Sequence, residues 1–386
     1  MAADTERFED VDWSELDEGR NALDRATLLR LVGFAAYALF LLYDVFVVPD
    51  GRETVPALNW DVTGVDWLFM ATLLAIGFYV VAPLVQNPRL TAYYWRQFKK
   101  NRMAVVSAVY LLAIFAIGTV VPMLVEVPQL NVIEAYQPPV GFSVDSAVPT
   151  SCVGESANGQ CYGSMAHPLG TTGQGKDIMM MVIFGMRVSM QVGLIAMLIS
   201  IVIATAVGTS AAYFGGWVDE VLMRYVDIQL TFPTFFLFLL LVYLFGGSLF
   251  LMIVIFGVTG WGGIARLVRS EALQRREEEY FQAAESAGAS DFYVIRRHLV
   301  PNVSNTVITA ATLAIPSLIL AEAALSFLSL GDPTIPSWGQ VIAAGRGNLS
   351  DAWWISTVPG VFLFVTIMAF NSLGDALRDA LDPRQE

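Results

Sequence analysis

The sequence has little charge, little cysteine and almost no histidine, and each shortage excludes a class of function. Only 15% of its 386 residues are charged, whereas soluble domains carry about 25%. Two histidines, His167 and His298, and two cysteines, Cys152 and Cys161, are its whole supply of imidazole and thiol ligands. No His-Glu-x-x-His, Gly-x-Ser-x-Gly or paired Cys-x-x-Cys motif is present. The sequence therefore predicts no catalytic residues, no metal site and no enzyme activity.

One phosphate-binding pattern is present only in part. Gly170 to Lys176 matches the G-x-x-x-x-G-K start of a P-loop, but Asp177 stands where Ser or Thr must bind Mg²⁺. The carboxylate would repel phosphate, and no apolar strand precedes the loop. We therefore expect a glycine-rich turn that binds no nucleotide, and no nucleic-acid partner. The segment Asp177 to Arg187 is expected to lie as an amphipathic stretch on the membrane surface.

Apolar residues are abundant and make up 55% of the chain. Runs long enough to cross a bilayer, about 20 residues each, predict an all-α polytopic membrane protein. Trp353 and Trp354, at the start of the last run, are typical of an aromatic anchor at the membrane interface. The eight candidate spans are 27–48, 66–86, 103–126, 189–213, 228–247, 249–265, 303–326 and 354–373.

Positive charge is distributed unevenly between the predicted loops. Lys and Arg favour the cytoplasmic side, and 18 of the 22 lie in segments placed inside when the N-terminus is inside. Both termini and the segment 266–302 are then expected in the cytoplasm of a multi-pass cell-membrane protein. The long loop 127–188 is expected outside, where an oxidising space permits a disulfide between Cys152 and Cys161. Two free thiols are the alternative.

A polar island, Arg266 to Asn302, separates two apolar runs. It holds six Arg and six acidic residues, and at about 2.5–3.5 kcal/mol per charge it cannot cross a membrane. One helical face in it carries an aromatic and small residues: Tyr280, Ala283, Ala284 and Ala287. The other face carries Gln282, Glu285 and Ser286. This pattern predicts a docking helix, and a helix that packs on its own protein is the alternative.

The island resembles the signature loop of binding-protein-dependent ABC importer permeases. In that loop Glu-Ala-Ala is followed after three residues by Gly, and after nine more by Ile-x-Leu-Pro. The corresponding positions here are Gln282-Ala283-Ala284, Gly288 and His298-Leu299-Val300-Pro301. Gln replaces the Glu, His the Ile and Val the Leu, whereas the Ala pair, the Gly and the Pro keep their spacing.

Further blocks make the resemblance specific to the C-type permease subunit of dipeptide, oligopeptide and nickel importers. They run in order from about residue 163 to the C-terminus, and residues 95–126 resemble the first span of that family. The blocks include His167-Pro-Leu-Gly-Thr171, Gly185-Met-Arg-Val-Ser-Met-Gln-Val-Gly193, Glu322-Ala-Ala-Leu-Ser-Phe327 and Pro336-Ser-Trp-Gly339.

The resemblance implies a type I ABC importer permease core of six helices, to which this chain adds two N-terminal transmembrane helices. Added anchoring and contact with a partner are both open as roles for these two. The expected organisation is an acidic cytoplasmic tail (1–26), the two extra spans (27–94), the first core span and long outer loop (95–185), the type-1 transmembrane domain (186–377) and a cytoplasmic tail (378–386).

The function implied is that of a permease subunit in an ATP-driven solute importer, without a cofactor of its own. Its implied protein partners are a second permease subunit, two cytosolic ABC ATPases and an extracellular solute-binding protein. The chain itself is expected to lie in the lipid bilayer. A peptide, nickel or another solute could be the substrate. A secondary transporter and a non-transport membrane subunit are the alternatives.

The resemblance also assigns roles to residues. The expected ATPase-coupling residues are Tyr280, Gln282, Ala283, Ala284, Ala287, Gly288 and Pro301. Gly288 is expected to end the docking helix, Ser290 and Asp291 to cap the next one, and Pro301 to end that helix before the following span. Glu322 and Asp227 are candidates for a gate or pathway, with solvation or pairing as the alternative. Pro233 and Pro316 are expected to kink their helices.

Overall fold

The computed structural model describes residues 25–49, 52–56 and 60–381. Most of the predicted tail 1–26, and residues 382–386 of the predicted C-terminal tail, lie outside the described residues. The helices of the first half are α2 (Arg25–Val47), α3 (Gly64–Ile76), α4 (Ala82–Gln86), α5 (Pro88–Phe98), α6 (Arg102–Leu124), α7 (Ile178–Phe214) and α8 (Gly216–Thr231). Those of the second half are α9 (Thr234–Phe245), α10 (Leu249–Thr259), α11 (Gly262–Arg276), α12 (Glu279–Ser286), α13 (Asp291–Val294), α14 (Val300–Phe327), α15 (Trp338–Gly345) and α16 (Trp354–Leu381).

Shorter elements connect these helices. Two π-helical turns, η2 (Gly77–Val81) and η4 (Ile295–Leu299), each lie between two α-helices of one continuous rod. One 3₁₀ turn, η3 (Val132–Glu134), and three short strands lie in the long loop between α6 and α7. The strands are β1 (Ser143–Asp145), β2 (Ser156–Ala157) and β3 (Gln160–Tyr162), and they form an antiparallel sheet in the order β1-β3-β2.

Seven of the described helical rods are long and apolar enough to cross a membrane, and the bent pair α8–α9 makes an eighth candidate. The predicted all-α polytopic class is therefore confirmed. The seven rods are Ala26–Val47, Gly64–Gln86, Arg102–Leu124, Ile178–Phe214, Leu249–Arg276, Asp291–Phe327 and Trp354–Leu381.

The predicted fifth span, 228–247, is not a single helix. α8 ends at Thr231, α9 begins at Thr234, and the two are bent by 72°. Pro233 stands at the break, where its missing N–H and fixed φ favour the end of a helix. The 12 residues of α9 extend only about 18 Å, which is less than the hydrocarbon thickness of about 30 Å. The chain is therefore bent where the sequence indicates one straight helix.

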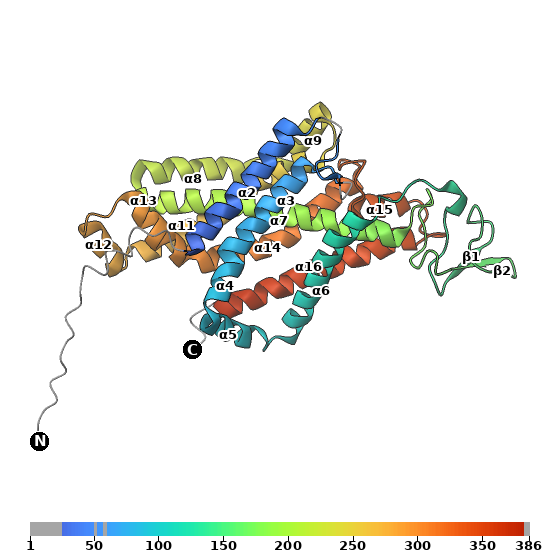
Figure 1. Ribbon diagram of the computed structural model, residues 1–386, viewed down its shortest axis with the longest axis horizontal. Coiled ribbons are helices and arrows are strands. Elements are labelled where there is room, and N and C mark those ends of the chain that lie inside the picture. Colours follow the sequence, from blue (N-terminus) through green and yellow to red (C-terminus); the bar gives the residue numbers. More distant parts are fainter. Residues whose placement is uncertain (1–24, 50–51, 57–59, 382–386) are drawn as a thin grey trace, which may run out of the picture.

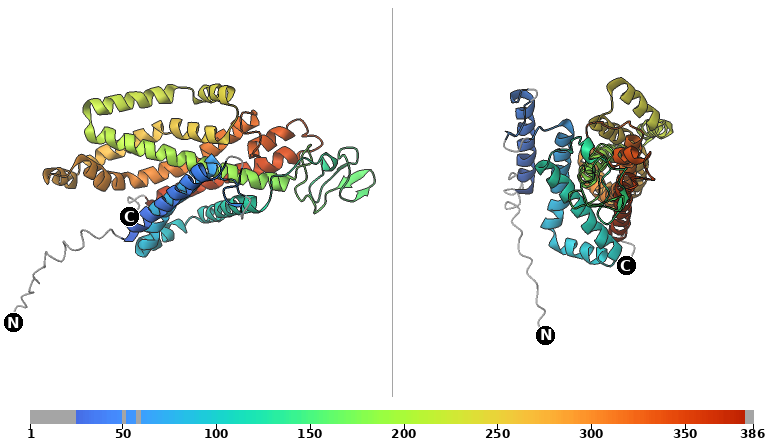
Figure 2. Two further views of the ribbon diagram at one scale, coloured as in Figure 1. Left: turned by 45° about the horizontal axis from the view of Figure 1, so that its top comes forward. Right: turned by 90° about the vertical axis from the view of Figure 1, so that its right-hand side faces the viewer.

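The two ends of the molecule differ in kind. α12 and α13 lie at one end of the long axis, whereas the β-strands and their loop lie at the other (Figure 1), and the left-hand view of Figure 2 agrees. The strand loop carries a disulfide between Cys152 and Cys161, with Cα atoms 5.7 Å apart. In the same loop the His167 ring lies 2.8 Å from Asp177 and 3.2 Å from Glu134, so this histidine holds the loop against the start of α7.

α7 is the central helix and begins earlier than the sequence indicates. Asp177 is its N-cap, and the Asp177 carboxylate accepts a hydrogen bond from the Met180 amide at 3.0 Å. Ile178 and Val182 are buried against other helices. The expectation of a surface-lying segment from Asp177 to Arg187 is therefore wrong. The adjoining P-loop-like stretch is a turn that closes from the Thr172 amide to the Lys176 carbonyl, 2.9 Å apart.

Two buried tryptophans pack beside the first turns of α7. The Trp338 indole donates to the Val182 carbonyl at 3.0 Å, and the Trp354 indole donates to the Thr171 carbonyl at 3.0 Å. Both side chains are fully buried. The interpretation of Trp354 as an interfacial anchor is therefore wrong, because the indole is a core element that joins α16 to the outer loop. Trp353 is only partly buried and packs edge-on against another ring of that loop.

Candidate functional site

A short helix, α12 (Glu279–Ser286), is present where the sequence predicts a docking helix. A negative charge in its first turn, Glu279, opposes the positive end of the helix dipole. Its end is defined by Gly288, whose φ of +80° places it in the left-handed region that suits glycine. The Ala289 amide then reaches back to the Ala284 carbonyl at 3.2 Å, the 6→1 bond of a glycine-terminated helix. The chain therefore turns sharply away after one short helix.

One side chain fixes α12 to the rest of the protein. Phe281 is only 1% exposed, and it packs in a cluster that joins α7, α11, α13 and α14. We call this the Phe281 cluster. Its buried members are Ala212, Tyr213, Val268, Ala272, Phe281, Val294, Leu299, Val303 and Val307. The sequence pattern did not single out Phe281, although a large apolar side chain in a strongly polar segment was the available signal.

Polar contacts surround the Phe281 cluster. The Tyr213 hydroxyl, at the end of α7, donates to the Asp291 carboxylate at 2.9 Å. Arg276 donates to the Ala212 carbonyl at 3.1 Å, and its guanidinium lies 6.0 Å from the centre of the Tyr213 ring. Ser290 occupies the N-cap of α13, but its side chain makes no capping hydrogen bond. The expected cap by Ser290 and Asp291 is therefore wrong, because Asp291 instead binds the tyrosine of a neighbouring span.

The break between α11 and α12 is held by charge. Arg275, in the last turn of α11, contacts Glu271 at 2.8 Å and Glu278 at 3.1 Å. Glu271 lies one turn earlier on the same helix, whereas Glu278 lies in the two-residue break before α12. One guanidinium therefore spans the corner at which the chain leaves the membrane-crossing rod.

The outward face of α12 is largely exposed, and only the Tyr280 ring on it lies near another ring outside α12, that of His298 at 6.3 Å among the described residues. Ala283, Ala287 and Gly288 are exposed, Tyr280 is 38% exposed, and Ala284 is half-buried. Gln282 is exposed on the opposite side. Partial burial, reinforced by nearby Glu278, raises the pKa of the Tyr280 phenol above its usual value, so this face is uncharged at physiological pH.

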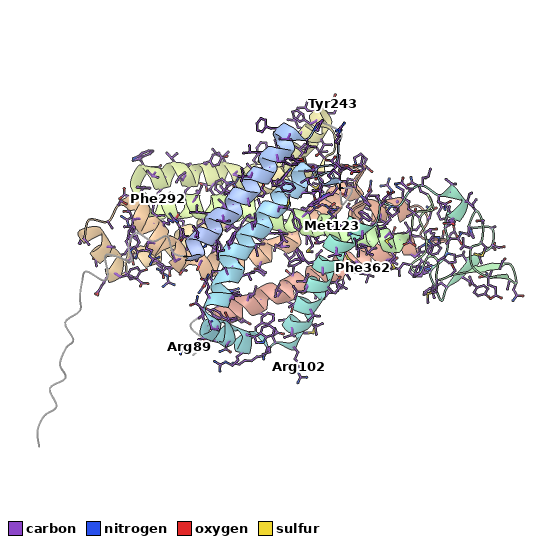
Figure 3. All side chains as sticks on the ribbon, in the orientation of Figure 1. Arg89, Arg102, Met123, Tyr243, Phe292 and Phe362 are labelled. Atoms are coloured by element: carbon purple, nitrogen blue, oxygen red, sulfur yellow. A yellow bond between two sulfur atoms is a disulfide. The ribbon has the colours of Figure 1, made fainter. Side chains whose placement is uncertain are left out.

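Two exposed aromatic rings of α13 lie at the same end of the molecule as this face. Phe292 is 71% exposed and Tyr293 is 52% exposed, and Figure 3 places Phe292 at the end formed by α12 and α13. Exposed aromatic patches on a protein commonly mark a binding surface. We define the coupling surface as Tyr280, Ala283, Ala287, Gly288, Phe292 and Tyr293. The sequence motif supplied the first four residues but not the two aromatic ones.

Pro301 does not end the helix, contrary to expectation. The rod from Asp291 to Phe327 is continuous, because the π-turn η4 precedes the proline and the Val300 amide bonds to the Ile295 carbonyl. The side chain of Asn302 donates to the His298 carbonyl at 2.6 Å, which satisfies one acceptor of the widened turn. The segment after the coupling surface is therefore joined to α14 without a break.

The two acidic candidates for a gate or pathway lie far from the coupling surface in the sequence and have separate partners. Glu322 is 1% exposed, and Ser326 donates to its Oε1 at 2.7 Å. Among the described residues none donates a hydrogen bond to Glu322 Oε2. Asp227, on α8, is half-exposed and pairs with Arg266 of α11. The structure therefore places one carboxylate in a helix-packing core and the other in an ion pair between helices.

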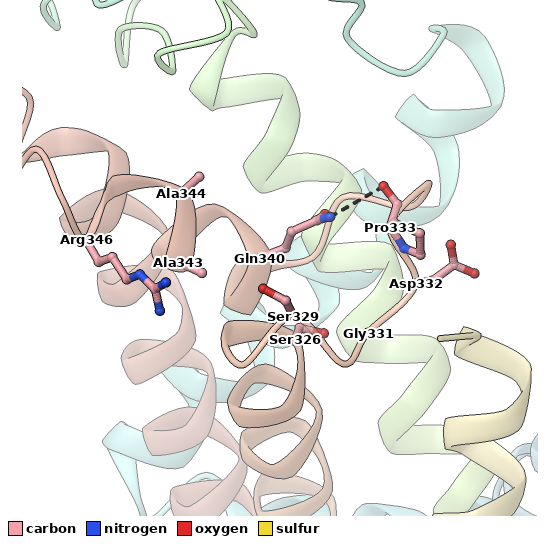
Figure 4. A pocket seen from close by; sticks show the side chains of 9 residues that line it. All are labelled: Ser326, Ser329, Gly331, Asp332, Pro333, Gln340, Ala343, Ala344 and Arg346. Carbon is pink, nitrogen blue, oxygen red and sulfur yellow. Dashed lines mark hydrogen bonds between the residues drawn. The ribbon is translucent and has the colours of Figure 1, made fainter. Parts of the chain in front are cut away.

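A cavity lies between the end of α14 and the short helix α15 (Figure 4). Its volume is about 270 Å³, and it borders Ser326, the hydroxyl that binds Glu322. Ser329 adopts a φ of +63° in the tight turn that forms its wall. A second cavity of about 580 Å³ lies between α15 and the outer loop, with Lys176 and Gln174 on its wall. Two cavities with some polar residues on mainly apolar walls thus lie on the strand-loop side, opposite the coupling surface.

Comparison with known families finds two matching models. The model described as "Binding-protein-dependent transport system inner membrane component" matches residues 200–386. The model described as "N-terminal TM domain of oligopeptide transport permease C" matches residues 89–139. Residues 1–88, which include α2, α3 and α4, lie outside both matches.

Similar proteins include three peptide permeases. The dipeptide transport system permease protein of Bacillus subtilis (strain 168) is 36% identical over 308 residues, which is 78% of this chain and 89% of that protein. The oligopeptide transport system permease protein of Haemophilus influenzae is 35% identical over 290 residues, with 75% and 87% coverage. That of Escherichia coli (strain K12) is 36% identical over 290 residues, with 75% and 89% coverage.

One similar solved structure is an inward-facing methionine ABC transporter. It is 19% identical in sequence with a TM-score of 0.45, and the match covers 53% of this chain and 98% of that one.

Proposed function

Because the chain belongs to the family of binding-protein-dependent transport system inner membrane components, we propose that it forms one half of the pathway of a peptide importer. As a member of that family it is a permease subunit of an ATP-driven solute importer and a multi-pass inner-membrane protein, which sets aside the secondary transporter and the non-transport subunit. The names of the most similar permeases support a peptide as the substrate. The predicted type I core plus two N-terminal spans is confirmed by the family matches together with the spans.

The coupling surface is the observation that carries the proposal for how energy arrives. A helix of eight residues is not stable alone in water, so α12 keeps its shape because Phe281 is buried in the Phe281 cluster. Its outward face offers alanines and a glycine, which allow close approach, beside the rings of Tyr280, Phe292 and Tyr293. A short rigid helix of this kind fits a groove on a partner. We assign that groove to a cytosolic ABC ATPase.

The route from this surface to the membrane is short and rigid. The Phe281 cluster contains residues of α7, α11 and α14, three of the rods long enough to cross a bilayer. α13 continues through η4 into α14 without a break. A partner that shifts α12 would therefore move the inner ends of three spans together. Such a movement requires only that the ATP-bound and the ATP-free states of the partner bind α12 in different positions.

The expected partners complete this scheme. Family membership supports ATPase and binding-protein partners in general. We further propose two ATPase subunits at the coupling surfaces of this chain and of a second permease subunit. An extracellular solute-binding protein would deliver the peptide to the strand-loop side, next to the cavities there. In this scheme Glu322 lies beneath the mouth of the pathway and Asp227 near its wall.

The same scheme fixes the proposed orientation. The distribution of Lys and Arg supports placing both termini and the coupling surface in the cytoplasm. The disulfide-bearing loop would then lie outside, where oxidation of Cys152 and Cys161 is permitted. Labelling of engineered cysteines with a membrane-impermeant reagent tests this orientation. Labelling of position 286 from outside intact cells would overturn it.

A tryptophan scan on α12 tests the coupling surface. Ala287→Trp places a bulky side chain on the outward face and should abolish peptide uptake without lowering the amount of permease in the membrane. Ser286→Trp adds the same bulk to the polar side of the same helix, and it should leave uptake nearly unchanged. ATP hydrolysis by the assembled transporter should lose its stimulation by peptide only in Ala287→Trp. Normal uptake in Ala287→Trp, or an equal loss in Ser286→Trp, would contradict the proposal.

A further inference from the structure

The extra N-terminal helices meet the permease core through α3. Its residues Val65 and Phe69 are buried in a cluster with Val192 of α7 and Met252 of α10. α2 lies on the outside of α3 and exposes its apolar surface, with Phe46 79% exposed. The two helices therefore differ in packing, because α3 belongs to the packed core and α2 does not.

The two oxygens of one carboxylate on α3, that of Asp66, accept hydrogen bonds from different places, one from the start of α3 and the other from α7. Asp66 Oδ2 accepts hydrogen bonds from the amide and the hydroxyl of Thr63, at 3.2 Å and 2.9 Å, which start α3 as a capping box. Asp66 Oδ1 accepts from Arg187 Nη2 at 2.6 Å and from Gln191 Nε2 at 3.1 Å. Both of those residues are on α7, one turn apart. The contact is therefore built from both sides rather than made by a loose surface pair.

Because the contact is buried, each charged side chain depends on the other for its compensation. The side chain of Asp66 is 7% exposed and that of Arg187 is 24% exposed, and Gln191 is 4% exposed. Removal of one partner of a buried ion pair leaves the other charge without compensation, which destabilises far more than loss of the pair as a whole. Arg187 lies on α7, the central helix of the bundle, and its counter-ion comes from α3, one of the two N-terminal spans that precede both family matches.

The pair also borders a cavity between α7 and the segment that precedes α15. A cavity of about 210 Å³ is lined by Asp66, Arg187 and Gln191 on one side and by Thr334 and Pro336 on the other. Those two residues precede α15 on the strand-loop side of the molecule. A movement of the outer end of α7 relative to these two residues would change the walls of this cavity.

We propose that Asp66 is a positioning residue, which holds Arg187 and Gln191 and so fixes the outer third of α7 during transport. The α2–α3 hairpin is then a working part of the permease through α3 rather than an added anchor. The proposal rests on the proposed function only for its transport measurement, because the ion pair can also be tested by stability alone.

A matched control is available in the same hairpin. Asp44 of α2 accepts hydrogen bonds from the Trp67 indole at 2.8 Å and from the Thr54 hydroxyl at 2.6 Å. These contacts lie within the hairpin and its loop, and neither reaches α7. Asp44→Asn therefore removes a charge from the hairpin without touching the pair with Arg187.

The test is a double-mutant cycle in the full-length chain, purified with its partner subunits. Asp66→Asn and Arg187→Gln should each lower the melting temperature by about 5 °C, and the double variant should recover much of that loss. At a temperature at which every variant is folded, Asp66→Asn should lower the peptide imported per ATP hydrolysed by about 2- to 30-fold. Asp44→Asn should leave the peptide imported per ATP hydrolysed unchanged. Combined with Arg187→Gln, it should not recover the melting temperature that Arg187→Gln loses.

Several outcomes would overturn the inference. Additive losses in the double variant would show that the two residues do not act as a pair. An unchanged ratio of import to hydrolysis in Asp66→Asn would reduce Asp66 to a structural role, and an equal loss in Asp44→Asn would assign the effect to the hairpin in general. If the wild-type transporter imports no peptide, the proposed function fails, while the melting temperatures still decide whether the pair exists.

Discussion

Replacement of Phe281 by alanine is expected to release α12 from the helices that cross the membrane. Phe281 is the buried side chain of α12 in the Phe281 cluster, and the opposite face of the helix is exposed. The remaining members of the cluster come from α7, α11, α13, η4 and α14, and they still pack against one another. The loss should therefore be a local detachment rather than unfolding of the protein.

The size of the effect follows from burial. Truncation of a fully buried Phe to Ala costs about 3–5 kcal/mol, and an isolated helix of eight residues contributes almost no stability of its own. Each 1.4 kcal/mol is a tenfold change in an equilibrium constant. A loss of about 3 kcal/mol therefore raises the detached population of α12 by roughly 100-fold.

Amide hydrogen exchange in a lipid nanodisc measures this population directly. Exchange of residues 281–288 should quicken about 100-fold in Phe281→Ala, with no change in the inner turns of α7 and α14. Phe292→Ala removes the same side chain from an exposed position on α13, and it should leave α12 protection at the wild-type level. Wild-type exchange of α12 in Phe281→Ala would refute the reasoning, and so would an equal increase across all helices, since Phe281 would then belong to the global core.

Three further predictions concern the outer loop, the core and pH. Cys161→Ser opens the disulfide with Cys152, and the loss of about 2–3 kcal/mol of chain-entropy stabilisation should appear as faster protease cleavage of the loop, with the melting of the spans unchanged. Trp354→Phe deprives the Thr171 carbonyl of its indole donor, and it should cost about 1–3 kcal/mol in chemical denaturation. The pKa of Tyr280 is raised, so its contribution to stability is complete below the ordinary tyrosine pKa and is lost as pH rises through the higher folded value. The difference in ultraviolet titration between wild type and Tyr280→Phe should show that this phenol ionises above the ordinary tyrosine pKa.

Local apolar length was enough to find most spans. The first three predicted spans, 27–48, 66–86 and 103–126, correspond to Ala26–Val47, Gly64–Gln86 and Arg102–Leu124. The backbone N–H and C=O groups of a membrane helix must form hydrogen bonds within the same segment. The position of such a helix can therefore be predicted from consecutive residues. The two predicted spans 228–247 and 249–265 were separated at residue 248, and the structure likewise has a break between α9 and α10.

The start of α7 was missed because the deciding residue is distant. Arg187 interrupts the apolar run and makes the region before residue 189 look like a surface segment. Its charge is neutralised by Asp66, 121 residues earlier in the chain, and nothing within a window around Arg187 records that partner. Trp354 was misread for the same reason, since its acceptor on Thr171 is 183 residues away.

The sequence predicted where the candidate site lies but not the buried side chain, Phe281, that holds it in place. The spacing of alanines and glycine located α12, because a docking face is a local periodic pattern. The pattern did not show that Phe281 would be buried, because its neighbours come from five other elements. Nor did it show that the helix would pass through Pro301, since a π-turn such as η4 depends on packing around it rather than on a residue signature.

The π-turn η4 amounts to one extra residue accommodated within a continuous rod. In an α-helix each residue turns the chain by about 100° and advances it by about 1.5 Å. Removal of one residue within 295–299 would therefore shorten the bulge to an ordinary turn and leave α12 and α14 aimed as before. Removal of one residue farther along α14 would rotate the whole coupling surface by about 100°. The junction between docking element and membrane span is thus a stretch of this rod in which a one-residue deletion can be absorbed without changing direction.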